Sequence, residues 1–124
     1  NNSSCVLHVM AQNQQVLLTG DIEKPAEKIL LSENLKSTIL VAPHHGSITS
    51  SSQKFVAAVN PRDVFFPIGY RNRFRFPSVV VKRRYQDVGA KMYDTAYSGA
   101  IEMYFGLNLY RFSHRHLWSF DVTP

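Results

Sequence analysis

The sequence predicts an α/β fold in which a mixed sheet carries its helices mainly on one face. From Ser4 to Gly89, short apolar runs alternate with segments of helical spacing, and the rest of the chain is strand-like throughout. The composition is 44% hydrophobic and 19% charged, which is typical of a packed domain. A chain of 124 residues has the length of one domain, so residues 1–124 are expected to form a single unit.

The first part of the chain predicts two strands, a helix and a third strand. Two short strands surround a polar turn at residues 11–14, and the second of them is QVLLTG. EKPAEKILLSENL predicts a helix, because Pro25 suits a first helical turn and apolar residues follow at helical spacing. STILVA, residues 37–42, is short, apolar and rich in β-branched side chains, which indicates a fully buried strand.

The second part continues the alternation and then changes to strands. SSSQKFVAAVN predicts a helix that has a serine cap and ends before Pro61. DVFFPIG predicts a strand, YRNRFRF a loop, and PSVVVKRRYQDVG a helix that stops at Gly89. AKMYDTA, GAIEMYF and LNLYRFSHRHLWSF are all strand-like. The expected order is therefore β-β-α-β-α-β-α-β-β-β.

Cysteine content and hydropathy exclude two classes of protein. Cys5 is alone, so an internal disulfide and a Cys-rich zinc ribbon are excluded, and its alternating apolar neighbours predict a buried side chain. No run of 18 apolar residues occurs, so no segment is expected to span a membrane. His114 and His116 have strand spacing near the end of the chain, where a solvated pair is the ordinary interpretation.

The charge of the chain permits an anionic partner. Lys and Arg outnumber Asp and Glu by 14 to 9, a net charge of +5. Arg71, Arg73 and Arg75 recur at every second position and would share a face in an extended segment, where phosphate contact and simple solvation both remain open. The aromatic residues between them, including Phe74, are expected to pack in the core or an interface or to stack on bases.

One carboxylate and two imidazoles are expected to meet at one edge of the sheet. Asp21 follows the strand QVLLTG, and His44 and His45 follow the next strand of the chain. Strands joined by a helical crossover tend to lie parallel, so their carboxyl ends share one edge, where ligand sites form. A carboxylate and an imidazole suit Zn²⁺ or Mn²⁺. The spacing therefore predicts a shared site, although two ligands do not complete a metal site.

Four segments of the chain carry a resemblance to a known family. They are LLTGDIE, VAPHHGS with the hydroxyl-rich residues after it, NPRDVFFPIGYRNRF, and VGAKMYDTAYSGAIEM. Together, from about Cys5 to Phe105, they resemble the metallo-β-lactamase-like domain of ComEC-type DNA-internalisation competence proteins. TGD alone is common, whereas TGD with PHHGS at this spacing and GYRN is much more specific.

The resemblance implies an αββα sandwich of which this chain is the second half. The first half would supply the superfamily's His/Asp-rich loop, so a divalent metal, Zn²⁺ or Mn²⁺, would need ligands absent from this fragment. By position, Asp21 matches the metal-bridging aspartate, and His45 or His44 matches the last histidine ligand. The other histidine would then hold a phosphate oxygen or donate a proton. Ser47 lies in the family's hydroxyl-rich turn, where DNA contact and ordinary turn bonding both stay open.

The resemblance also implies a location and partners. The parent would be a polytopic protein of the bacterial inner membrane that takes in single-stranded DNA. This soluble domain, on the periplasmic or outer side, would degrade the strand that is not transported. The implied partners are single-stranded DNA and the remainder of the parent protein. Half a sandwich would leave an apolar sheet face uncovered, so the fragment alone is expected to form a homo-oligomer.

Two positions depart from the family pattern. The pattern predicts GHP after YRNR, and this chain has RFP, with Phe76 in the place of the histidine. Ile48 stands where many relatives have the lysine of HHGSKTS. Both changes remove contributors to phosphate binding and favour a non-catalytic DNA-guiding module, whereas Asp21 with the histidines favours a metal-dependent nuclease. A metallohydrolase of another phosphodiester is the third interpretation.

Overall fold

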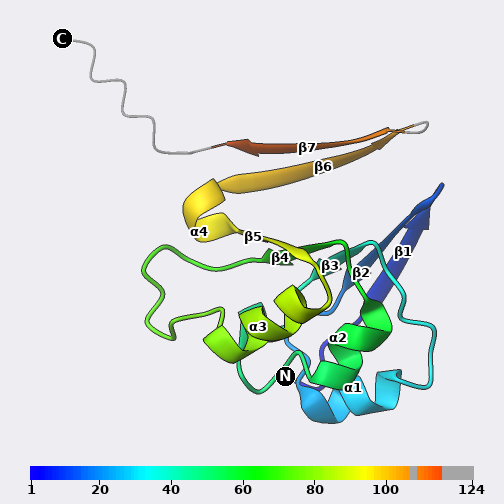
Figure 1. Ribbon diagram of the computed structural model, residues 1–124, viewed down its shortest axis with the longest axis vertical. Coiled ribbons are helices and arrows are strands. Elements are labelled where there is room, and N and C mark those ends of the chain that lie inside the picture. Colours follow the sequence, from blue (N-terminus) through cyan, green and yellow to red (C-terminus); the bar gives the residue numbers. More distant parts are fainter. Residues whose placement is uncertain (107–108, 116–124) are drawn as a thin grey trace.

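A computed structural model of the chain describes residues 1–106 and 109–115, with side chains described through Tyr104. It confirms the α/β class. A five-stranded sheet has the order β1-β2-β3-β4-β5, in which β1 and β2 are antiparallel and each later pair is parallel (Figure 1). The strands are β1 (Leu7–Ala11), β2 (Gln14–Leu18), β3 (Ile39–Val41), β4 (Asp63–Phe66) and β5 (Lys91–Asp94).

Three helices cover one face of this sheet, as the sequence predicts. They are α1 (Lys24–Leu30), α2 (Gln53–Val59) and α3 (Val79–Asp87), and all three lie on the same side of the strands in Figure 1. Ser52 and Ser78 cap α2 and α3 by accepting hydrogen bonds from backbone amides of the first turn. The core between helices and sheet contains Leu17, Leu40, Val64, Phe66, Phe55, Val56, Val59, Val81 and Tyr85.

The end of the described chain differs from the prediction of further strands in one sheet. A short helix, α4 (Thr95–Ser98), follows β5 because the Asp94 side chain accepts a hydrogen bond from the amide of Tyr97. Gly99 then reverses the chain with φ 70°, a value that favours glycine. The strands β6 (Ala100–Gly106) and β7 (Leu109–Arg115) pair with each other in a separate ribbon. Sequence patterns do not reveal such a change of sheet.

The second face of the five-stranded sheet is apolar and only partly covered. The strand register places Leu7, Val9 and Val16 on the face opposite the helices, together with Phe65 of β4. The β6–β7 ribbon lies over this side in Figure 1, and a hollow of about 240 Å³ remains between ribbon and sheet. At the edge strand β1, Leu7 and Val9 remain 55% and 39% exposed.

Three further sequence expectations concern the lone cysteine, the histidines near the end of the chain, and membrane-spanning segments. Cys5 is exposed, so the expected buried position is wrong; it precedes β1, and the alternation of that edge strand does not carry it under the helices. The side chain of His114 and the whole of His116 lie outside the described residues. Among the helices described, none is long and apolar enough to cross a membrane.

Candidate functional site

The predicted meeting of Asp21 with a histidine is confirmed. Asp21 follows β2, where its amide donates to the Ser4 hydroxyl, and the amide of His44 donates to the carbonyl of Gly20. The two strand ends are therefore joined directly. Nε2 of His45 lies 3.3 Å from Oδ1 of Asp21, and both side chains are about half exposed, at 42% and 45%.

The two histidines occupy a left-handed turn and do not end the strand as expected. β3 stops at Val41, and the turn of residues Pro43–Gly46, called the histidine turn below, follows it. The φ angles of His44, His45 and Gly46 are 47°, 56° and 82°. Left-handed backbone costs a non-glycine residue about 1–2 kcal/mol, and such strain is typical of functional sites. Because of this turn, each imidazole reaches a different carboxylate.

Buried polar groups hold the segment after the histidine turn. The Ser50 hydroxyl donates to the carbonyls of Pro43 and Ser47. The carboxylate of Glu27, fully buried on α1, accepts hydrogen bonds from the amides of Ser51 and Ser52. A buried carboxylate bound in this way is costly to disturb, so it fixes the loop against α1.

The Tyr85 side chain supports the same segment from α3. Its hydroxyl is hydrogen-bonded to the hydroxyl of Ser51, and the Arg84 guanidinium donates to the Ser51 carbonyl at 2.9 Å. Burial raises the pKa of the Tyr85 hydroxyl far above its ordinary value. The tyrosine is therefore a neutral structural group of the loop.

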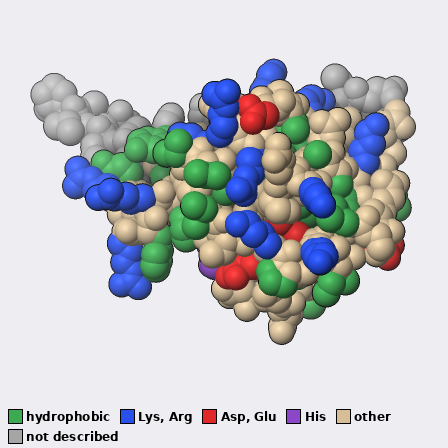
Figure 2. Space-filling view, turned by 60° about the horizontal axis from the view of Figure 1, so that its bottom comes forward, with side chains coloured by type: hydrophobic (Ala, Val, Ile, Leu, Met, Phe, Trp, Pro, Cys, Tyr) green, Lys and Arg blue, Asp and Glu red, His purple; other side chains and the backbone are tan. Residues whose placement is uncertain are grey.

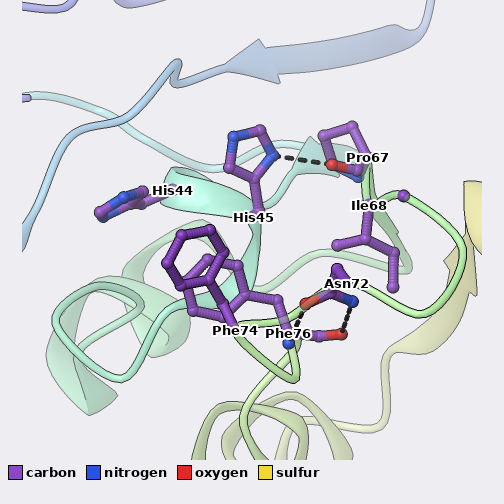
Figure 3. A pocket seen from close by; sticks show the side chains of 8 residues that line it. His44, His45, Pro67, Ile68, Asn72, Phe74 and Phe76 are labelled. Carbon is purple, nitrogen blue, oxygen red and sulfur yellow. Dashed lines mark hydrogen bonds between the residues drawn. The ribbon is translucent and has the colours of Figure 1, made fainter.

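His45 is oriented by a backbone carbonyl. Its Nδ1 lies 2.7 Å from the carbonyl oxygen of Pro67, an atom that can only accept, so Nδ1 carries the proton (Figure 3). Nε2 is left facing Asp21. Metal-binding imidazoles are commonly oriented by such a bond from the other ring nitrogen. The ring is thus oriented so that Nε2 is the nitrogen available to a ligand.

His44 forms a second pair, with Glu23. Its Nδ1 lies 3.2 Å from Oε1 of Glu23 and 3.5 Å from the Thr49 hydroxyl. The hydrogen bond from the Asn1 side chain lowers the pKa of Glu23, and the charge of His44 acts in the same direction. Glu23 therefore remains a carboxylate. Sequence reasoning missed this residue, although its position two residues after Asp21 placed it in the same loop.

The histidine turn and the loop after β4 enclose a pocket of about 550 Å³. In Figure 3 the two imidazoles lie along one side and the rings of Phe74 and Phe76 along another. Phe76 contacts both histidines, with ring centroids 6.0 Å from His44 and 6.5 Å from His45. The loop after β4, which contains Phe76, therefore reaches the same sheet edge as Asp21, as expected.

The loop of residues 69–76, called the arginine loop below, presents its cations to solvent. Arg71, Arg73 and Arg75 are all exposed, with the guanidinium groups of the first two over the rings of Tyr70 and Phe74. Figure 2 shows basic side chains beside apolar ones at the left edge, the side on which this loop lies in Figure 1. Their contact with DNA stays a prediction.

Ser47 lies inside the turn that follows the histidines. It is 5% exposed, and its hydroxyl lies 2.9 Å from the Thr49 hydroxyl and accepts from the Thr49 amide. These bonds are the ones expected if Ser47 only stabilises the turn. A role of Ser47 toward DNA stays a prediction.

The Asp21–His45 pair fits part of a metal site. Zinc bonds to nitrogen and oxygen of about 2.0–2.2 Å, in tetrahedral geometry, separate two ligand atoms by about 3.4 Å. The observed separation of 3.3 Å matches this value. Within residues 1–104, however, no group of three or more His, Cys, Asp or Glu side chains is placed to hold a metal. The described residues therefore place two possible donors together and no third one beside them.

The chain is similar in sequence to known proteins, and two of those described here are named for competence. The competence protein ComA of Neisseria gonorrhoeae is 41% identical over 110 residues, which cover 86% of this chain and 16% of ComA. The chain is homologous to one segment of competence proteins. ComE operon protein 3 of Bacillus subtilis is 30% identical over the whole chain, and the uncharacterised Escherichia coli protein YcaI is 40% identical over 91% of it. The chain spans about 15% of the length of these two relatives. No family model matches it.

Proposed function

We propose that this segment acts on DNA during natural transformation and contributes part of a metal-dependent nuclease site. The observation that carries the proposal is the Asp21–His45 pair, two donors at 3.3 Å with one imidazole nitrogen already fixed by Pro67. The names of the homologues support the process, competence. The exposed arginine loop supports an anionic polymer as substrate.

Each residue of the site has a role in this proposal. Asp21 and His45 would hold a divalent cation, Zn²⁺ or Mn²⁺, together with ligands outside the described residues. Such a cation would activate water and neutralise phosphate charge. His44, paired with the Glu23 carboxylate, is placed to hold a proton and release it at the pocket. Phe76 would supply an apolar ring beside both imidazoles.

Hydrolysis of labelled single-stranded DNA by the full-length protein tests this function. With Mn²⁺ or Zn²⁺ added, Asp21→Asn and His45→Gln should each lower the rate by at least about 100-fold, the scale of losing one catalytic group. Asp87→Asn is the matched control, because it removes a carboxylate from an exposed ion pair on α3. A wild-type protein that degrades no DNA under any divalent metal would contradict the nuclease.

A non-catalytic DNA-guiding module is the second candidate, and the Phe76 ring favours it. This apolar ring packs against both histidines at the position where the family pattern predicts a third imidazole. A guiding module would bind single-stranded DNA with the same salt dependence and show no metal-dependent cleavage. The hydrolysis assay therefore separates the two candidates, and DNA binding is common to both.

The apolar sheet face supports the proposed partners. Leu7, Val9 and Leu18 are each more than a third exposed on one side of the sheet. We propose that the remainder of the parent protein covers this face in an αββα sandwich at the inner membrane, and that the isolated chain self-associates through it. Sedimentation of the isolated chain as a stable monomer at high concentration would contradict the self-association.

A further inference from the structure

The pocket beside the histidine turn has an aromatic wall that stays open to solvent. Phe74 is 61% exposed, and its ring lies nearly parallel to that of Phe76, with an angle of 18° and centroids 5.4 Å apart. Tyr70, four residues earlier, is 64% exposed. Neither of these two exposed rings packs in the core, which was one expectation from the sequence. Of the two, Phe74 lines the pocket. An exposed aromatic ring is costly in water, so its position at a pocket indicates a ligand.

The wall is held in shape by hydrogen bonds and not by burial. The Asn72 side chain accepts from the amide of Phe76 at 2.7 Å and donates to its carbonyl at 3.0 Å. The amide of Asn72 itself donates to the Gly69 carbonyl. Figure 3 shows this clamp beside the stacked rings. The loop therefore presents Phe74 in a preorganised position, which lowers the entropic cost of binding a flat ligand.

The charges around the wall suit a ligand that is flat and also anionic. The Arg73 guanidinium lies 4.8 Å from the centre of the Phe74 ring. A cation–π contact at an exposed site is weaker than stacking of a base on an aromatic ring. A base can therefore replace the guanidinium on the ring, and Arg73 is then free to contact phosphate. Arg71 over Tyr70 repeats the arrangement.

We propose that this pocket takes one unpaired nucleobase of a single-stranded nucleic acid, stacked on Phe74, with Arg71 and Arg73 on the adjoining phosphates. The volume of about 550 Å³ lies within the range of small-ligand pockets, about 300–1,000 Å³. A base inside a duplex cannot present its face in this way, so the pocket selects single strands. The inference rests on the proposed function only in taking nucleic acid as the ligand.

Two oligonucleotides of equal length and charge test the base pocket in the full-length protein. One is an oligothymidylate and the other carries abasic sites throughout, and binding is measured by fluorescence anisotropy at several salt concentrations. The oligothymidylate should bind about 5- to 150-fold more tightly, the fold-change expected from stacking one base. Phe74→Ala should abolish this preference and Phe74→Trp should keep it. Ile29→Ala, which removes an exposed apolar side chain from α1, should change neither affinity.

Arg73→Ala distinguishes the contribution of base stacking to affinity from that of the phosphate contacts. It should weaken binding of both oligonucleotides, reduce each salt slope by about 0.7, and leave the preference for bases intact. Equal binding of the two oligonucleotides by the wild-type protein would overturn the base pocket while DNA binding stands. Binding of neither would overturn the proposed function and the pocket together.

Discussion

Gly46→Ala tests how the core positions the histidine turn. Gly46 has φ 82°, and a Cβ there would lie 2.6 Å from Cβ of Pro77 and 2.9 Å from the ring of Phe66. Left-handed backbone costs an alanine about 1–2 kcal/mol, and overpacking a core adds about 1–3 kcal/mol. Phe66 is 1% exposed and cannot turn away into solvent. The variant should therefore lose about 2–5 kcal/mol of unfolding free energy.

Gly89→Ala is the matched control for this prediction. Gly89 has φ 74°, and a Cβ there would meet nothing within 4 Å, so only the backbone cost of about 1–2 kcal/mol applies. Urea denaturation followed by circular dichroism should separate the two variants by about 1–3 kcal/mol with unchanged m-values. Gly46→Ala should also weaken the metal binding that we propose for the neighbouring His45. Equal stability losses in the two variants would refute the close approach of Phe66 to the turn.

Three further predictions concern the pH dependence, the arginine loop and the aromatic ring at the histidines. Because burial raises the pKa of Tyr85 above its ordinary value of 10.0, the unfolded chain releases a proton above about pH 10 that the folded chain keeps. Above this pH, the free energy of unfolding should fall by up to about 1.4 kcal/mol per pH unit. Denaturation at several pH values should show that Tyr85→Phe removes this slope whereas Tyr97→Phe does not. Replacing all three arginines of the arginine loop by alanine should reduce the slope of log affinity for single-stranded DNA against log salt by about 2; an unchanged slope would make the loop an ordinary solvated surface. Phe76→His should tighten Zn²⁺ binding measured by calorimetry, since it places a third imidazole beside the other two; unchanged affinity would show that this position does not reach the metal.

The sequence predicted the main sheet and the meeting of Asp21 with His45 at its edge because both follow from the order of strands and helices. Helical crossovers imply parallel strands, and parallel strands bring Asp21 and His45 to one edge. The partner of His44 was missed because a strand was expected where the backbone is left-handed, and strand geometry would send neighbouring side chains to opposite faces. The Asn72 side chain bonds both backbone groups of Phe76 within the loop that exposes Phe74, and hydropathy does not encode such a local arrangement.

The central claim is that Asp21 and His45 bind the same metal ion, and a double-mutant cycle tests it most directly. Zn²⁺ affinity of the full-length protein is measured by calorimetry for Asp21→Asn, His45→Gln and the double variant, with Asp87→Asn as control. If both side chains hold one ion, each single variant should lose most of the affinity and the double variant should lose little more. Losses that simply add, or single variants that bind as tightly as the wild type, would contradict a shared metal site.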